Sequence, residues 1–104
     1  MDEKKYAVVT TTCANDEEAG KIAAVLLEKR LAACVQMLPI SSNFIWKGEL
    51  CNEKEILLLI KCRADHYDAI EQEILKNHSY EVPEILLLPV AGGYREYLDW
   101  IDSA

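Results

Sequence analysis

The sequence predicts an α+β fold: one four-stranded sheet, two helices that cover one of its faces, and a further helix at the C-terminus. Three observations support this prediction. Apolar runs without polar alternation, strongest at residues 56–60 and 85–88, are typical of strands buried on both faces. Two segments outside these runs have apolar residues at helical spacing. The resulting order, β-α-β-β-α-β followed by a helix, fits a single domain over residues 1–104.

The first strand is expected at about residues 5–12, and the first helix follows it. Asn15 is a good N-cap, and Glu18 three residues later gives the pattern of a capping box. Lys29 and Arg30 end the helix where cations are favoured by its dipole. The apolar stripe that faces the sheet consists of Ala19, Ile22, Ala23, Leu26 and Leu27.

A long hairpin is predicted over residues 31–62, with its turn around residues 47–49. Its first strand is expected to begin at Leu31 and to alternate between two faces of the sheet. Pro39 cannot donate a hydrogen bond to a neighbouring strand, so we expect a bend or an edge position there. The alternation puts Ala33, Val35 and Met37 on one face and Cys34, Gln36 and Leu38 on the other.

The second half of the chain repeats the helix-then-strand order. A helix is expected over residues 64–77, with Asp65 as its cap. The loop before Pro83 is expected because the residue preceding a proline avoids helical conformations. A last strand over residues 84–90 then leads to the C-terminal helix. The apolar stripes of the two helices are Tyr67, Ile70, Ile74 and Leu75 in the first, and Tyr94, Tyr97, Leu98 and Ile101 in the second.

The order of elements predicts a sheet with one uncovered face. Two right-handed β-α-β crossovers put both long helices on the same face, as in ferredoxin-like folds. The other face carries the remaining half of each apolar strand, and the C-terminal helix either covers part of it or packs on a neighbouring subunit. Burial of apolar surface contributes about 25 cal/mol per Å². We therefore expect a homo-oligomer.

Charge and cysteine content exclude several classes of protein. The formal net charge of −7 argues against nucleic acid as a partner. No apolar run approaches the roughly 20 residues that span a membrane, and the N-terminal residues lack the apolar core of a secretory signal. Without a C-x-x-C pair or such a signal, reduced thiols in a cytoplasmic protein are expected. The cysteines are Cys13, Cys34, Cys51 and Cys62.

Short motifs occur in a fixed order from Val8 to Ile101. They include Leu31-Ala32-Ala33-Cys34-Val35, Trp46-Lys47-Gly48-Glu49, Leu58-Leu59-Ile60-Lys61, His78-x-Tyr80-Glu81-Val82-Pro83-Glu84 and Tyr97-Leu98-x-Trp100-Ile101. Together they resemble the CutA family, the divalent-cation tolerance proteins. The resemblance implies a ferredoxin-like fold assembled as a homotrimer, similar in architecture to PII signalling proteins. It also implies binding and tolerance of copper and other divalent metal ions, and no enzyme activity.

The resemblance also singles out candidate site residues. It assigns the family's conserved cysteine to Cys34 and its histidine to His78, and it puts Glu53, Glu55, Trp46, Tyr80 and Glu84 on pattern positions. A thiolate and an imidazole suit copper or zinc, and the carboxylates of Glu53 and Glu55 could complete the coordination. Cys34 and His78 are far apart in the sequence and could meet only through the fold. The hypothesis is a weak copper site between subunits.

Simpler interpretations of the same residues stay open. Cys34 is better explained as a small buried strand residue, and His78 is equally well explained as a loop residue at the end of a helix. Trp46, Tyr80 and Glu84 could line a ligand cleft between subunits, but aromatic residues at interfaces also serve packing alone. Cys13 lies near a helix N-terminus, where a thiol pKa can be lowered, although an ordinary core thiol is favoured.

Three functions remain in competition. The leading one is a non-enzymatic trimer that binds divalent metal and supports metal tolerance. The second is a PII-like sensor or scaffold that binds a small molecule in its intersubunit clefts. The third is a hydrolase or thiol enzyme with Cys34 as nucleophile and His78 as base, which requires Cys34 to be exposed in a cleft within hydrogen-bond reach of His78.

Overall fold

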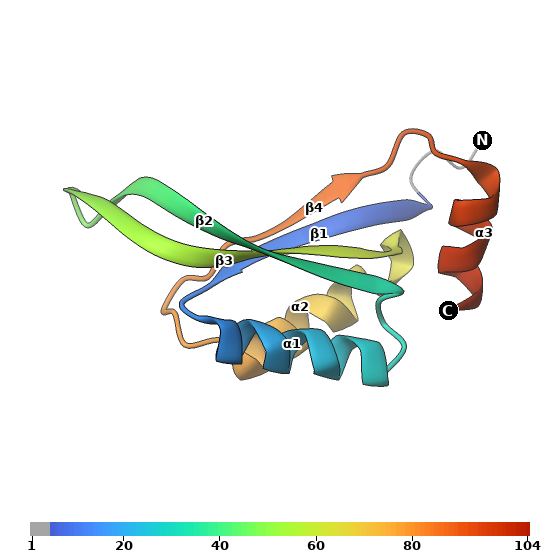
Figure 1. The fold of residues 1–104 in the computed structure, drawn as a ribbon, viewed down its shortest axis with the longest axis horizontal. Helices are drawn as coiled ribbons and strands as arrows, with labels where there is room; N and C mark the ends of the chain where they lie inside the picture. The colour runs from blue at the N-terminus through green and yellow to red at the C-terminus, as the bar shows by residue number, and fades with distance from the viewer. Residues whose placement is uncertain (1–4) are drawn as a thin grey trace.

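The computed structural model describes residues 5–104, which form one antiparallel four-stranded sheet and three α-helices (Figure 1). Across the sheet, the strands are β2 (Cys34–Trp46), β3 (Glu49–Arg63), β1 (Tyr6–Cys13) and β4 (Ile85–Pro89). The helices are α1 (Asp16–Glu28), α2 (Tyr67–Asn77) and α3 (Arg95–Ser103). The predicted α+β order, β-α-β-β-α-β with a C-terminal helix, is confirmed. No helix in the described residues is long and apolar enough to span a membrane.

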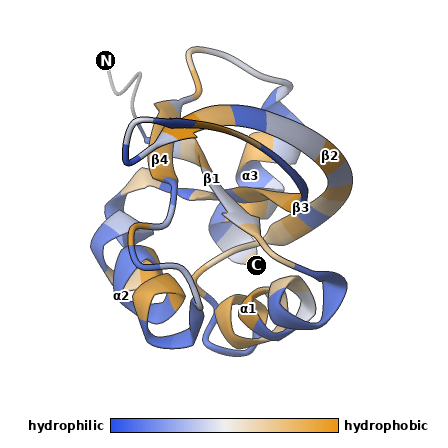
Figure 2. Cartoon of the chain, turned by 90° about the vertical axis from the view of Figure 1, so that its left-hand side faces the viewer, coloured by the Kyte–Doolittle hydropathy of each residue, from blue (hydrophilic) through white to orange (hydrophobic). Residues whose placement is uncertain are grey.

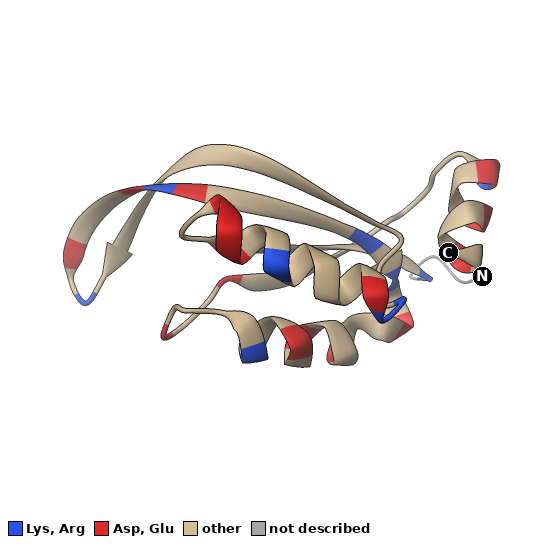
Figure 3. Cartoon of the chain, turned by 60° about the horizontal axis from the view of Figure 1, so that its bottom comes forward, with Lys and Arg blue, Asp and Glu red and all other residues tan. Residues whose placement is uncertain are grey.

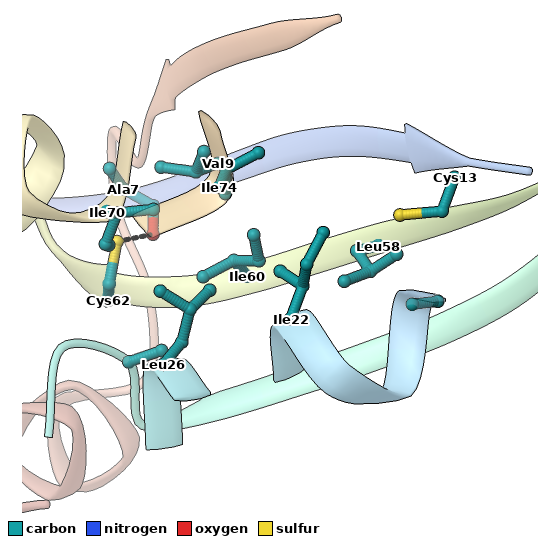
Figure 4. Packing of buried hydrophobic residues seen from close by; sticks show 12 residues of the cluster. Ala7, Val9, Cys13, Ile22, Leu26, Leu58, Ile60, Cys62, Ile70 and Ile74 are labelled. Atoms are coloured by element: carbon teal, nitrogen blue, oxygen red, sulfur yellow. Dashed lines mark hydrogen bonds between the residues drawn. The ribbon is translucent and has the colours of Figure 1, made fainter. Parts of the chain in front are cut away.

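Helices α1 and α2 lie side by side on one face of the sheet, whereas α3 packs at one end (Figures 1 and 2). The buried residues of α1 and α2 are apolar, namely Ala19, Ile22, Leu26, Ile70 and Ile74, and the coloured ribbons show hydrophilic and charged positions interspersed with the apolar ones along both helices (Figures 2 and 3). Figure 4 shows the resulting core, in which side chains of β1 and β3 meet those of the two helices. Fully buried members include Val9, Leu58, Ile60, Ile22, Leu26, Ile70 and Ile74.

The opposite face of the sheet is left largely open, as the sequence predicts. The strand register puts Leu57 and Leu59 of β3 on this face, and both are only half-buried. Leu38 of β2 is 44% exposed, and Leu86 and Leu88 of β4 are 55% and 49% exposed. The apolar run of β3 therefore has one buried side and one side that a single chain does not cover.

The hairpin begins at Cys34 rather than at Leu31, because the preceding residues end α1. Arg30 adopts a positive φ of 58°, which turns the chain at the helix end. The backbone N–H groups of Arg30 and Leu31 then donate to the carbonyl oxygens of Leu27 and Leu26 at 3.1 and 3.0 Å. These two hydrogen bonds form a Schellman motif, which keeps residues 30 and 31 out of the sheet.

The hairpin turn and Pro39 agree with the sequence. Lys47 and Gly48 have φ angles of 51° and 82°, the pattern of a type I′ two-residue turn. Pro39 lies within β2 and is paired with Ile56 of β3. The strand continues through Pro39 without a break, and β2 is an edge strand of the described sheet, where a residue without an N–H is tolerated.

Several local predictions are wrong. The helix expected from Ala64 begins with a separate 3-10 turn over Ala64–His66, and Asp65 pairs with Arg63 at 2.9 Å instead of capping. Asn15 caps α1 by accepting from the backbone N–H of Glu18 at 2.9 Å, but the Glu18 carboxylate bonds to Ser79 rather than completing a capping box. Four stripe residues are largely exposed: Leu27 (39%), Leu75 (48%), Tyr94 (70%) and Tyr97 (39%).

Candidate functional site

A hollow of about 870 Å³ lies between the far half of the β2–β3 hairpin and the loop that joins α2 to β4. It is lined by residues 42–46 and 51–55 of the hairpin and by residues 79–84 of the loop, in part. The long hairpin curves over this loop, so residues distant in the sequence face one another. Five of the seven predicted site residues line this hollow: Trp46, Glu53, Glu55, Tyr80 and Glu84.

The hollow has an acidic lining. Four of its residues are glutamates, and Lys54 is its one lysine. Charges of one sign in a concave surface add their fields, so such a hollow raises the local concentration of cations. At its rim, the Lys47 ammonium is 4.0 Å from the Glu81 carboxylate, and both side chains are more than two-thirds exposed, so this pair neutralises little. The glutamates are Glu53, Glu55, Glu81 and Glu84.

Two of these carboxylates are held by hydroxyl groups. The Tyr80 hydroxyl donates to Glu55 Oε2 at 2.7 Å, and Glu55 is only 8% exposed. Burial, together with this hydrogen bond and the negative charge of Glu55, raises the pKa of Tyr80 well above its usual value. The Thr10 hydroxyl donates to Glu84 Oε2 at 3.0 Å from the open face of the sheet. Glu55 and Glu84 are therefore oriented by the fold before any ligand binds.

Cys34 and His78 do not meet within one chain. Cys34 is half-buried on the open face and pairs with Lys61 of β3. His78 contacts the carbonyl oxygen of Thr12, whose strand partner is Leu57. Lys61 and Leu57 are four positions apart on β3, a separation of about 13 Å along the strand. The thiol-enzyme hypothesis therefore has no geometric basis within one chain.

His78 instead lies beside two residues that the sequence analysis did not select for metal binding. The ligand atoms of Cys13, Glu18 and His78 all lie within 4.8 Å of one another. It is the one group of three or more such residues found in the part of the chain that the structure describes. The available signal was weak: Cys13 and Glu18 lie on either side of the start of α1, and Glu18 matched a capping pattern.

The Cys13 thiol differs from what its place near a helix N-terminus suggested. Burial raises the pKa of Cys13 to about 12, and the negative charges of Glu18 and Glu55 act in the same direction. The residue is fully buried. Cys13 is therefore not a reactive thiolate, and all four cysteines are free thiols in the structure.

Comparisons with known proteins agree on one family. The family model described as "CutA1 divalent ion tolerance protein" matches residues 7–104. The divalent-cation tolerance protein CutA of Thermus thermophilus is 43% identical over 95 residues, which are 90% of this chain and 92% of that protein. The CutA of Archaeoglobus fulgidus is 42% identical over 87 residues, 84% of this chain and 85% of that protein.

Solved structures agree with these sequence matches. The structure described as the periplasmic divalent cation tolerance protein CutA from Archaeoglobus fulgidus superposes with a TM-score of 0.92 at 39% identity, covering 94% of this chain and 96% of that one. CutA1 from the psychrotrophic bacterium Shewanella sp. SIB1 gives a TM-score of 0.92 at 38% identity, covering 97% and 95%.

Proposed function

Since this chain belongs to the family of CutA1 divalent ion tolerance proteins, we propose that it supports tolerance of divalent cations by binding them. The observation that carries the proposal is the acidic hollow under the hairpin. Residues on three separate segments come together there, and four of them are glutamates. Carboxylates attract divalent cations, and a hollow that is partly removed from water strengthens this attraction.

A homotrimer is part of the proposal. The apolar surface of the open sheet face, including Leu86 and Leu88, supports association because a soluble monomer rarely leaves such a contiguous patch in water. The far end of the hairpin adds further exposed apolar residues, with Ile45 at 70% and Leu50 at 88%. Association of three copies around this face would bury both surfaces and enclose the acidic hollow more fully.

Copper is the cation we propose first. Imidazole and thiol groups favour copper over hard cations such as Mg²⁺. A copper site that uses Cys34 and His78 requires the two residues to come from different subunits, because one chain keeps them apart. Glu53 and Glu55 are its proposed carboxylate ligands. Four free thiols suit a reducing compartment, so a cytoplasmic location belongs to the same proposal.

The size and lining of the hollow also support a second candidate function. A volume of about 870 Å³ falls in the range of small-molecule sites, and Phe44, Trp46 and Tyr80 contribute aromatic walls. A PII-like sensor would bind an organic ligand there between subunits. Native mass spectrometry of protein purified without added metal distinguishes the two functions, since a sensor would carry an organic mass and a tolerance protein would carry metal.

Calorimetric titration with Cu²⁺ and Zn²⁺ tests the leading function. The double variant Glu53→Gln, Glu84→Gln removes two negative charges from the hollow and keeps the shapes of the side chains. Glu96→Gln together with Glu71→Gln removes two charges from the helices and serves as the matched control. We expect the first variant to bind more weakly and the control to match the unmodified protein; equal affinities in all three would reject the hollow as the binding surface.

A further inference from the structure

We propose that Cys13, Glu18 and His78 form a metal site within a single chain, suited to a thiophilic ion such as Zn²⁺ or Cu⁺. This site is separate from the acidic hollow, and it is an alternative to the intersubunit copper site, since both would use His78. The three residues come from the end of β1, the first turn of α1 and the loop after α2. A bound ion would therefore fasten three elements together on the helix-covered side of the sheet.

The spacing of the ligand atoms fits a tetrahedral ion. His78 Nδ1 is 3.3 Å from Glu18 Oε2. Zinc bonds of about 2.0 Å to nitrogen and oxygen at the tetrahedral angle give a nitrogen-to-oxygen separation of about 3.3 Å. The Cys13 sulfur lies within 4.8 Å of one ligand atom of each of the other two residues, whereas a zinc–sulfur bond of about 2.3 Å requires a separation of roughly 3.6 Å. A shift of about 1 Å in the Cys13 side chain completes three ligands.

The hydrogen bonds of His78 leave Nδ1 unprotonated, so this nitrogen can bind a metal. Nε2 is 2.7 Å from the Thr12 carbonyl oxygen, which can only accept, so Nε2 carries the proton. Metal-bound histidines are typically oriented in this way, with the second ring N–H donated to a carbonyl or carboxylate. Nδ1 then has a free lone pair, which accepts from the backbone N–H of Tyr80 at 3.1 Å. A metal would take over that lone pair.

The contact between His78 and Glu18 brings two hydrogen-bond acceptors close together. Nδ1 already accepts a hydrogen bond from Tyr80, and the Glu18 carboxylate can also only accept, yet the two atoms are 3.3 Å apart. Two acceptors at this distance repel each other unless a positive charge lies between them. The His78 side chain is 1% exposed, so bulk water does not screen this repulsion. A metal ion at the same point would attract both atoms.

Hydrogen bonds from Ser79 orient the Glu18 carboxylate for metal binding. Ser79 donates its backbone N–H to Glu18 Oε2 and its hydroxyl to Oε1, each at 2.8 Å. These bonds fix the carboxylate next to His78, and the 12% exposure of its side chain leaves a route from solvent. When the metal binds, the Cys13 thiol loses its proton to solvent and the sulfur bonds to the ion as a thiolate. No electron transfer is involved.

Cobalt substitution tests the site, because a thiolate bound to Co²⁺ gives a sulfur-to-metal charge-transfer band that carboxylate and imidazole ligands do not give. The key variant is Cys13→Ser, which removes the sulfur and keeps the volume. Cys62→Ser is the matched control: Cys62 is another fully buried core cysteine, but it lies at the opposite end of the core (Figure 4). Cys34→Ser tests the intersubunit copper site, which would use the same histidine but a different sulfur. Circular dichroism verifies that each variant is folded.

We expect one thiolate-bound Co²⁺ per chain in the unmodified protein and in the Cys62→Ser and Cys34→Ser variants. Cys13→Ser should lose the band, and its Zn²⁺ affinity at this site should fall by more than the roughly tenfold to hundredfold that loss of an outer-shell partner costs, because a ligand itself is removed. Glu18→Gln should keep the band but bind more weakly. The proposal is overturned if the unmodified protein gives no band, or if the band survives Cys13→Ser. A band lost only in Cys34→Ser also overturns the proposal and supports the intersubunit copper site instead. If the unmodified protein binds metal without giving any band, the proposal is overturned and the acidic hollow is the binding surface.

Discussion

The hydrogen bond between Tyr80 and Glu55 is expected to hold the wall of the acidic hollow in place. The Tyr80 hydroxyl donates to the Glu55 carboxylate at 2.7 Å, and Glu55 is 8% exposed, so water does not readily replace the hydroxyl. Hydrogen bonds to charged groups contribute about 1.5 to 3 kcal/mol. Tyr80→Phe keeps the ring, whose centroid is 4.8 Å from that of His78, and removes only the hydroxyl. We expect a loss of about 2 kcal/mol in the free energy of unfolding.

Thermal unfolding followed by circular dichroism measures this loss. For a domain of this size, about 2 kcal/mol corresponds to a decrease in Tm of roughly 10 °C. Protein concentration must be equal in all samples, because oligomers unfold at temperatures that depend on it. Tyr67→Phe is the matched control: its hydroxyl donates to Glu71 at 2.9 Å, but both groups lie on one turn of α2. Tyr67→Phe should lower the free energy of unfolding by no more than about 1 kcal/mol. Equal losses in the two variants would refute the reasoning.

Three further predictions follow from single positions. The Thr11 hydroxyl is fully buried without a hydrogen-bond partner in residues 5–104, so Thr11→Val should raise the free energy of unfolding by about 1 kcal/mol in urea titrations; a decrease would mean that the hydroxyl is paired. Gly48 has a φ of 82°, which is unfavourable for alanine, so Gly48→Ala should lower the free energy of unfolding by about 1 kcal/mol and speed amide hydrogen exchange in the hairpin. Unchanged exchange would argue that the turn does not require glycine. A hydrogen bond from the Tyr6 hydroxyl, and then Lys5 and Arg63, lower the pKa of Asp102. The stabilising effect of the ionised Asp102 should therefore be complete above about pH 5 and be lost as the pH falls below about 4. Asp102→Asn should abolish this part of the acid dependence of unfolding, and identical acid profiles of the variant and the unmodified protein would contradict the prediction.

The sequence predicts most of the fold because its signals act locally. Uninterrupted apolar runs identified β3 and β4, helical spacing identified α1 and α2, and Gly48 marked the hairpin turn. The errors lie at the ends of elements. The hairpin starts later than Leu31 because Arg30 adopts a left-handed conformation without being a glycine, and the sequence gives no sign of that. Asp65 failed as a cap because Arg63 competes for its carboxylate.

The residues of the candidate sites were likewise predicted only in part. Family motifs identified five residues that do line one hollow, since motif positions reflect the shared fold. The same reasoning linked His78 to Cys34 on the basis of residue type alone, although the strand register separates them in one chain. Cys13 and Glu18 were missed as partners of His78 because their proximity depends on how the loop after α2 packs against the start of α1. Sequence spacing does not record that contact.

Native mass spectrometry of the untagged protein, titrated with Cu²⁺ and Zn²⁺, tests the central claim most directly. That claim is that copies of the chain associate through the open sheet face and bind divalent metal. The account predicts the mass of a homotrimer that takes up metal ions in multiples of three. A monomer at micromolar concentration, or a trimer that takes up no more metal than the Glu53→Gln, Glu84→Gln, Cys13→Ser triple variant, would contradict it.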